Sequence, residues 1–403
     1  MNLIRWSSAV LPLLAAVGCA TSFESDVAFL RRHTETIVLA ERNGHARVAI
    51  CPALQGRVMT SAAAAHGGRS FGWINYALIA SGVTQRHINV YGGEDRFWIG
   101  PEGGQFSVFF AKGAPQDLEH WQTPAPIDTE PFVVVKKEDD RVSLRKTMRL
   151  ENASGAAFDV EVFRELRLLP ADAAWKNLAL ARDSEELVRM VAFESVNRVT
   201  NAGKTEWTRA TGALSVWILG MFTPSPATTV VIPFRKGPEA ELGPIVNDGY
   251  FGKVPSDRLK VGDGVLYFRG DGMHRGKIGL SPRRARPLMG SWDAENEVLT
   301  LVQFTLADPN LPYVNSMWEV QKDPFAGDAV NSYNDGPPAP GKEPLGPFYE
   351  LESSSPAAAL KPGHSLRHTH RTFHFIGPRE KLDVVARTTL GIGLDAIEAA
   401  FER

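Results

Sequence analysis

The sequence predicts an all-β protein folded as one sandwich-like domain. Runs rich in β-branched and aromatic residues recur along the chain, and Gly, Pro, Asp or Asn bounds each run. Helical periodicity is weak outside a few short segments. Many short strands at turn-punctuated intervals, without alternating helices, favour a sandwich or a barrel over a parallel α/β fold.

The strands and helices are expected at defined positions. The strand-like runs are Ile37–Leu39, Val48–Ile50, Phe106–Phe110, Phe132–Lys136, Val142–Leu150, Phe158–Leu169, Phe348–Glu352 and His364–Phe375. The helical segments are Asp26–Arg32, Phe71–Ser81 and Leu394–Arg403. The longest irregular stretch, Asp323–Pro347, is rich in Pro and Gly. We interpret it as a loop over the site, because so long a loop in a compact domain is usually functional or mobile.

Composition and charge limit the classes of function. The chain has 403 residues, of which 43% are hydrophobic, so it can bury a large core as a single all-β domain. Its 44 basic residues nearly balance its 46 acidic residues, and no basic stripe is interleaved with aromatics. Nucleic acid is therefore not expected as a partner. The sequence carries no Walker loop, Rossmann glycine pattern, zincin motif or Gly-x-Ser-x-Gly elbow, and no cofactor is predicted.

The first residues have the pattern of an export signal. Arg5 supplies a positive charge, and Trp6 to Val17 form an uncharged run too short to span a bilayer. The following tetrapeptide, Ala16-Val17-Gly18-Cys19, resembles a bacterial lipobox. That resemblance implies cleavage before Cys19 and attachment of a lipid to its thiol. An ordinary signal peptide cleaved nearby is the alternative.

These observations give an expected organisation and location. Residues 1–18 form the lipoprotein signal peptide, 19–33 a tether, and 34–403 a single carbohydrate-binding-like β domain. Because Ala20 is not acidic, we expect a lipid-anchored bacterial cell-envelope protein on the periplasmic face of the outer membrane. Membrane contact is expected through the lipid anchor only. Cys51 lies in a strand-like run and is interpreted as a buried structural thiol.

Two carboxylates near the C-terminus fall on one face of a predicted strand. Side chains alternate along a strand, so Glu350 and Glu352 point the same way, about 6.5–7 Å apart. After a Lys361-Pro362-Gly363 turn, the next strand carries four histidines on one face, while Phe373 and Phe375 lie on the other. These histidines are His364, His368, His370 and His374. We expect the carboxylates and the histidines to form one site on adjacent strands.

The histidine strip has three interpretations. His368 and His370 have the spacing of a His-x-His metal site, with a carboxylate on a neighbouring strand. They could also be satisfied or solvent-facing side chains, or take a sugar-binding or acid/base role. No metal site is predicted, because two close ligands fall short of the three or four that a tight site needs.

A second candidate site lies in Tyr91–Gly104, where glycines adjoin aromatic and charged residues. Glycines let the backbone approach a ligand, and Trp98 or Phe97 could stack on a sugar ring. The polar candidates for binding its hydroxyls are Tyr91, Glu94, Asp95 and Arg96. The alternative is a turn with an Asp-Arg surface pair and a core tryptophan.

A third group of candidates surrounds the long irregular stretch. Trp318, Glu319, Gln321, Asn334 and Asp335 supply an aromatic, carboxylates and amides, the groups that recognise hydroxyl patterns, although Asn-Asp-Gly is equally an ordinary turn. A nearby basic cluster could bind an anionic sugar, but we interpret it as a solvated charged turn. Its members are Lys277, Arg283, Arg284 and Arg286.

The order of a late-strand Glu, small residues with Pro, Leu-x-Pro-Gly and a final strand resembles the C-terminal part of galactose mutarotase-like (aldose 1-epimerase) proteins. Other stretches look like a bacterial lipoprotein branch of the same superfamily, and the resemblance spans about residues 34–376. These stretches are Asp248–Lys253, Phe268–Gly279, Tyr313–Gln321 and Asn331–Gly336. The resemblance implies a galactose mutarotase-like β-supersandwich with a carbohydrate in its concave cleft.

In that superfamily a strand-borne Glu is the catalytic base, a role that the resemblance gives to Glu352 or Glu350. Two departures matter. Tyr91 stands where the family has the His of a His-Gly-Gly motif. No histidine lies between His120 and His274, where the family has its general acid. His87 or the C-terminal histidines are substitutes on chemistry alone.

We therefore expect a membrane-tethered carbohydrate-binding protein that holds its ligand in the concave cleft. One alternative is a sugar epimerase or another sugar-active enzyme. The other is a non-catalytic structural protein of the cell envelope, which predicts a closed or apolar cleft.

Overall fold

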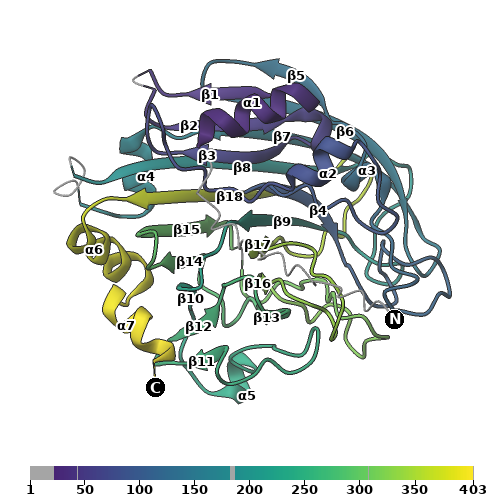
Figure 1. Ribbon diagram of the computed structural model, residues 1–403. Helices are drawn as coiled ribbons and strands as arrows, with labels where there is room; N and C mark the ends of the chain where they lie inside the picture. The colour runs from purple at the N-terminus through teal and green to yellow at the C-terminus, as the bar shows by residue number, and fades with distance from the viewer. Residues whose placement is uncertain (1–21, 43, 182–186, 307, 403) are drawn as a thin grey trace, which may run out of the picture.

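Strands dominate the computed structural model, which describes residues 22–402 except 43, 182–186 and 307 (Figure 1). The described residues form three antiparallel sheets of ten, five and three strands. The all-β prediction is confirmed. The expected signal peptide and Cys19 lie outside the described residues. None of the helices in the described part combines the length and the apolar character that a membrane span needs.

The largest sheet forms one layer of a sandwich and has the order β11-β12-β10-β14-β15-β18-β8-β7-β6-β5. Its strands are β5 (Val133–Lys137), β6 (Arg141–Glu151), β7 (Ala157–Leu168), β8 (Arg189–Asn201), β10 (Thr228–Pro233), β11 (Leu259–Val261), β12 (Val265–Arg269), β14 (Leu288–Asp293), β15 (Val298–Phe304) and β18 (Ser365–Ile376). β8 and β18 pair along their whole lengths at the centre of this sheet.

The five-stranded sheet forms the second layer, in the order β13-β16-β17-β9-β4. Its strands are β4 (Arg96–Gly100), β9 (Ser215–Phe222), β13 (Gly276–Leu280), β16 (Val330–Asn334) and β17 (Tyr349–Ser354). The small sheet consists of β1 (Ile37–Ala40), β2 (Arg47–Cys51) and β3 (Arg57–Ala62).

Short helices cover the outside of the sheets. They are α1 (Phe23–His33), α2 (Tyr76–Ser81), α3 (Ala125–Asp128), α4 (Ala171–Asn177), α5 (Glu239–Leu242), α6 (Arg379–Leu390) and α7 (Leu394–Glu398), with 3-10 turns η1 (Pro52–Leu54) and η3 (Ala399–Phe401). Figure 1 places α1 across the small sheet and α6 and α7 at one end of the large sheet.

Apolar side chains form separate clusters on the two faces of the large sheet. Side chains such as Val142, Leu144 and Ile218 fill the space between the two large sheets. On the outer face, Phe373 and Phe375 of β18 pack with Leu382 and other apolar residues of α6 and α7. β18 therefore turns its phenylalanines outward toward the helices and its histidines toward the other sheet, as alternation predicts.

Several elements differ from the sequence prediction. Phe106–Phe110 forms no strand, although its aromatic residues are mostly buried, because turns on both sides fold it as a packed loop. In the segment Phe71–Ser81 only Tyr76–Ser81 is helical, starting at the cap residue Asn75. The long stretch predicted as a loop contains β16.

The segment expected as a tether, residues 19–33, contains helix α1, and the structure packs this helix on the domain. Ser22 accepts a hydrogen bond from Ser25 N at its start, with acidic residues in the first turn and basic residues in the last. Phe23, Val27 and Leu30 of this helix form a buried apolar cluster with side chains of the small sheet, among them Met59 of β3. Residues 23–33 are therefore part of the folded unit.

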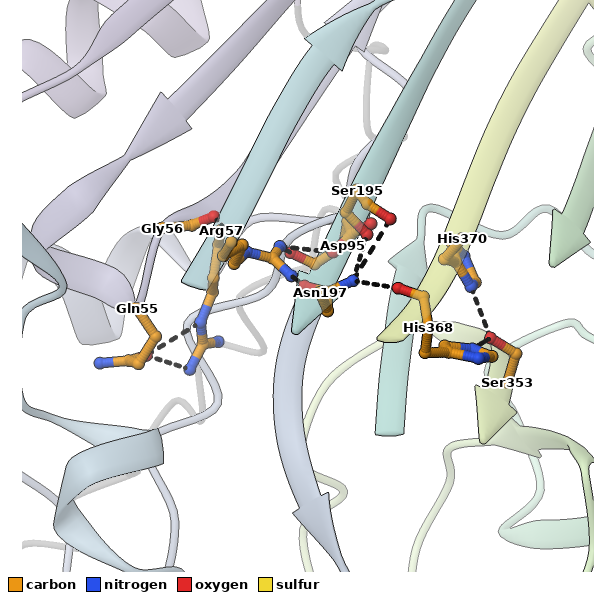
Figure 2. A network of polar contacts seen from close by, with 10 residues as sticks. Gln55, Gly56, Arg57, Asp95, Ser195, Asn197, Ser353, His368 and His370 are labelled. Carbon is orange, nitrogen blue, oxygen red and sulfur yellow. Dashed lines mark hydrogen bonds and ion pairs between the residues drawn. The ribbon is translucent and has the colours of Figure 1, made fainter. Parts of the chain in front are cut away.

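A buried ion pair between Arg164 and Asp95 ties the layers together, and Figure 2 labels Asp95 and two further partners of Arg164, Gly56 and Asn197. Arg164 of β7 and Asp95, just before β4, are both fully buried, with 2.5 Å between Arg164 Nη2 and Asp95 Oδ1. The same guanidinium donates to Asn197 Oδ1 on β8 and to the carbonyl of Gly56. Arg164 thus joins the large sheet to the first strand of the five-stranded sheet and to the turn before β3.

Asp95→Ala should lower the free energy of unfolding by about 3–5 kcal/mol, because it leaves the buried Arg164 charge without its counter-charge. Urea denaturation at neutral pH measures this change. Asp263→Ala is the matched control, because that carboxylate is exposed and pairs with Lys236 at the surface. A loss in Asp95→Ala no larger than in Asp263→Ala would mean that the buried pair does not hold the layers together.

Candidate functional site

One face of the five-stranded sheet carries a polar row that spans several strands. Lys277 on β13 lies opposite Tyr333 on β16, Tyr333 opposite Glu350 on β17, and Glu350 opposite Met221 on β9. In the next row, Glu352 lies opposite Leu219, and Leu219 opposite Arg96 on β4. Residues in register on alternate positions share a face, so these side chains project to the same side of the sheet.

A cleft of about 1090 Å³ lies over this face. Its floor includes Arg96, Lys277 and Glu350. Other parts of the lining come from α2, from the loops that carry His87 and Trp121, and from a rim segment within residues 335–345. Sequence segments far apart therefore converge on one concave site, the arrangement typical of small-molecule sites in proteins.

Glu350 is a buried carboxyl group on β17 that lines the cleft. It is 5% exposed, and Arg96 Nη2 donates to its Oε1 at 2.8 Å. Burial is the largest cause that raises the pKa of Glu350, and Arg96 and Lys277 oppose it while neighbouring Glu352 adds to it, so that the pKa is about 8. A large share of the Glu350 carboxyl groups therefore carries a proton at neutral pH.

Glu352 lies deeper and does not line the cleft. Its Oε2 accepts hydrogen bonds from Lys277 Nζ at 3.0 Å and from Trp217 Nε1 at 2.9 Å. Burial alone would lower the pKa of Lys277, but the charges of Glu352, Glu102 and Glu350 raise it, so the ammonium persists. The Lys277 ammonium also lies 4.6 Å from the Trp217 ring, within cation–π range. The two strand glutamates thus have different environments.

Glu102 is a further buried carboxyl group that lines the cleft. It is 6% exposed and follows β4, and burial raises its pKa while Lys277 lowers it. Gly103 packs this loop tightly against the loop of Trp318, since a Cβ at Gly103 would lie 2.2 Å from the Met317 carbonyl oxygen. Within the loop that carries Trp318, Gln321 Nε2 donates a hydrogen bond to Met317 O at 2.7 Å. Close packing therefore fixes Glu102 and Trp318 side by side.

Four indoles line the cleft in a continuous chain. Ring centroids lie 5.4 Å apart for Trp217 and Trp98, 6.4 Å for Trp98 and Trp121, and 5.6 Å for Trp121 and Trp318. The last two rings are stacked, and Trp318 remains partly exposed. His87 lies 2.7 Å from the Trp121 carbonyl oxygen through Nδ1. Since a carbonyl accepts, Nδ1 carries the proton and Nε2 is left as an acceptor.

Several buried polar atoms at the cleft have no hydrogen-bond partner in the described part of the protein. They are Trp98 Nε1, Trp121 Nε1, Arg96 Nε and Glu352 Oε1. Buried polar groups are normally paired, so a cluster of unpaired donors and an acceptor beside a cleft indicates a place where ligand or solvent supplies the partner.

The structure brings part of the sequence-predicted residues to this cleft. Trp98, Arg96, Trp318, Asp335 and Glu350 line it. Asp335 also accepts from Tyr333 Oη at 2.5 Å and from Gly346 N at 2.8 Å, so it anchors the rim segment at both ends.

Other predicted residues lie away from the cleft. Asp95 pairs with Arg164 in the interior, and Glu94 accepts from Ser61 Oγ at 2.9 Å between the layers. Tyr91 packs with the cluster around the small sheet, under the Arg57 guanidinium.

Near the long irregular stretch, Glu319 is exposed, and fully buried Asn334 donates to His274 O and accepts from Gly272 N. The basic cluster is split as well. Lys277 reaches the cleft, but Arg284 is buried and donates to the backbone carbonyls of Arg235, Gly237 and Gly243.

Three of the four histidines, His368, His370 and His374, face the interior between the sheets, whereas His364 precedes β18 and is exposed. The Ser353 hydroxyl lies 2.8 Å from both His368 Nε2 and His370 Nδ1, as Figure 2 shows. Burial lowers the pKa of His368 to about 3 and that of His370 to about 4, so both rings are neutral. His374 contacts Glu94 and Thr300. The expected union of histidines and carboxylates on adjacent strands is wrong, because β17 and β18 belong to different sheets.

In the described residues, no group of three or more His, Cys, Asp or Glu is placed to hold a metal ion.

The sequence analysis did not identify Glu102, Trp217, Trp121 or the role of Lys277 in the cleft. Glu102 stands within the Gly-rich stretch after β4, which was an available signal. Nothing in the sequence marks Trp217, because it lies in a continuous apolar strand.

Comparison with protein families identifies the chain. Residues 21–401 match the model of a family of unknown function (DUF6786). This chain belongs to that family. Among curated proteins, no match was found for this family member.

Solved structures similar to this DUF6786 member include three bacterial proteins. The Slr1438 protein from Synechocystis sp. PCC 6803 is 14% identical, with a TM-score of 0.49 over 86% of this chain and 96% of its own. A proposed aldose 1-epimerase from Escherichia coli K12 is 12% identical, with a TM-score of 0.49 over 85% and 99%. A galactose mutarotase-like protein from Lactobacillus casei is 10% identical, with a TM-score of 0.47 over 84% and 100%.

The pH dependence of stability should carry the signature of Glu350. Its pKa is about 8 in the folded protein against 4.5 ordinarily, so the folded state binds more protons between these values. Its contribution to stability is complete below about pH 4.5 and is lost as the pH rises through about 8. Glu350→Gln cannot ionise. Its free energy of unfolding, relative to the wild type, should therefore rise between about pH 5 and about pH 8.5.

Urea denaturation at several pH values measures this difference, with Asp263→Asn as the control for an exposed carboxylate. The control should follow the wild type. Parallel curves for Glu350→Gln and the wild type would contradict the raised pKa.

Proposed function

We propose that this protein binds a carbohydrate in the cleft over the five-stranded sheet. The observation that carries the proposal is the meeting of a partly exposed tryptophan with a buried carboxylate–arginine pair in one concave site. Indole faces pack against the apolar C–H faces of sugar rings, while carboxylates and guanidinium groups bind hydroxyls with defined geometry. The sequence resemblance to galactose mutarotase-like proteins supports the same ligand class.

Three features of the cleft support a binding role over a structural one. The cleft is open and large, whereas a structural protein was expected to have a closed or apolar one. Its floor holds charged groups in fixed positions, because Arg96 and Lys277 are both paired with strand carboxylates. Unpaired indole N–H groups beside it need acceptors. Holding charged and polar groups ready in this way lowers the entropy lost on binding.

The proposal includes the expected location. A lipid on Cys19 would hold this domain at the bacterial cell envelope, which intact-mass analysis of the N-terminal peptide from membrane fractions tests. An N-terminal peptide without acyl chains would remove the tether from the proposal and leave the cleft unaffected.

Glu350→Gln should weaken carbohydrate binding about tenfold or more, because Gln puts an NH2 group where the carboxyl group has an oxygen, and a hydrogen-bonding group left without its partner costs about 1–3 kcal/mol. Quenching of tryptophan fluorescence can report binding, since four tryptophans line the cleft. The ligand is first selected on a glycan array, and its affinity is then measured with the purified chain. Asp263→Asn is the control. Unchanged affinity in Glu350→Gln, with the ligand demonstrably bound, would place the site elsewhere.

A second candidate function is acid/base chemistry on the bound sugar, as in an epimerase. The specific observation is that Glu350 lines the cleft with a pKa of about 8, close to the pH at which a group can both donate and accept a proton. Glu102 and His87 also line the cleft, and either could serve as the complementary group. The histidine that serves as general acid in galactose mutarotase-like proteins has no counterpart in this sequence, so one of these side chains would have to replace it.

If this chemistry occurs, the wild type should speed interconversion of sugar anomers, and Glu350→Gln should reduce the rate by about 100-fold or more. Exchange NMR measures the interconversion with the ligand found on the array. Equal rates with and without the wild-type protein would restrict the function to binding.

A further inference from the structure

The cleft is larger than one sugar ring requires. Its volume of about 1090 Å³ lies slightly above the ~300–1,000 Å³ range of clefts that enclose drug-sized ligands. A single hexose is much smaller than such a ligand and would leave most of the lining without contact. The size therefore suits a ligand of several linked rings.

The lining has two chemically different zones that meet at Trp217. The charged zone holds Glu350 with Arg96, and Lys277 with the deeper Glu352. The aromatic zone is the chain of four indoles that begins at Trp217, whose Nε1 donates to Glu352, and ends at Trp318. A ring held at Glu350 alone would not use the far end of this chain.

The aromatic zone also has hydrogen-bonding capacity of its own. Trp98 and Trp121 are 3% and 6% exposed, and the Nε1 atoms of both lack a partner within the described residues. Buried N–H groups of this kind need an acceptor. A second sugar ring offers hydroxyl and ring oxygens as acceptors as well as an apolar face. The indole zone is therefore equipped as a binding subsite separate from the charged floor.

Charge decides between neutral and anionic glycans. Four cationic and five acidic side chains line the cleft, so there is no excess of positive charge. The cationic ones are Arg86, Arg96, Arg275 and Lys277, and the acidic ones are Glu102, Glu119, Asp335, Glu343 and Glu350. Arg96 and Lys277 are already paired with carboxylates. A chain of acidic sugars would meet these carboxylates without enough cations to balance them.

We propose that the cleft binds a neutral oligosaccharide, with one ring on the charged floor at Glu350 and the following ring along the indoles toward Trp318. This inference rests on the proposed carbohydrate-binding function and specifies its ligand class. Trp318 then extends the site from one sugar ring to several.

The test is a titration of the full chain with length series of neutral glycans. The probes are gluco-oligosaccharides with α- and β-linkages and xylo-oligosaccharides, from one to six units, with oligogalacturonates as the anionic series. Calorimetry should show affinity rising about tenfold or more from the monosaccharide to the trimer in a neutral series. Trp318→Ala should remove that gain in affinity with chain length, because one stacked aromatic contact contributes up to roughly tenfold.

Two variants control for loss of structure. Trp318→Phe keeps an aromatic face and should retain part of the length dependence. Val320→Ala changes an exposed side chain, 81% accessible, in the same loop and should match the wild type.

The outcomes separate this inference from the function on which it rests. Equal affinity for the monosaccharide and its oligomers would overturn the inference and leave carbohydrate binding standing. Tighter binding of oligogalacturonates than of every neutral series would overturn the neutral class. Absence of binding to any glycan would remove the carbohydrate proposal itself and the inference with it.

Discussion

The buried pair of Arg164 and Asp95 is the interaction on which the arrangement of the site depends. It fixes the start of β4 against the large sheet at a point where both side chains are completely shielded from water. Because side chains alternate along a strand, pinning Asp95 toward the interior directs its neighbour Arg96 to the opposite face. Arg96 there meets Glu350, a residue 254 positions away in the chain. The Arg164–Asp95 pair inside the sandwich thus determines the position of the Arg96–Glu350 pair in the cleft. Removing Asp95 would leave Arg164 as an unpaired buried charge and would disturb both places.

The cleft separates two neighbouring carboxylates by their surroundings. Glu352 is held by an ammonium and an indole N–H, whereas Glu350 faces the cleft beside one guanidinium. Environments that differ in this way allow two identical side chains to differ in charge at one pH. For a binding protein, the consequence is a floor that can both donate and accept hydrogen bonds. For an enzyme, the same feature would supply a proton-transfer group.

The all-β class could be predicted from the sequence, and so could the side chains that share a face on β17 and on β18, because alternation with period two is a local property of a strand. Glu350 and Glu352 do share a face, and Phe373 and Phe375 do lie opposite the histidines. The expected contact between these two faces failed for a non-local reason. β17 pairs with β9 and β16, and β18 pairs with β8 and β15, partners that a single sequence does not specify. The same limit hid Trp217, which reaches the cleft through strand pairing and lies in a segment without a motif, and it hid the role of Lys277 in the cleft.

The crystal structure of a complex with a glycan selected on an array tests the central claim most directly. The account predicts a sugar ring in the cleft, with a hydroxyl group within hydrogen-bond distance of the Glu350 carboxyl and a ring face against an indole of the tryptophan chain. A glycan bound at any other surface, with the cleft occupied by solvent alone, would contradict it.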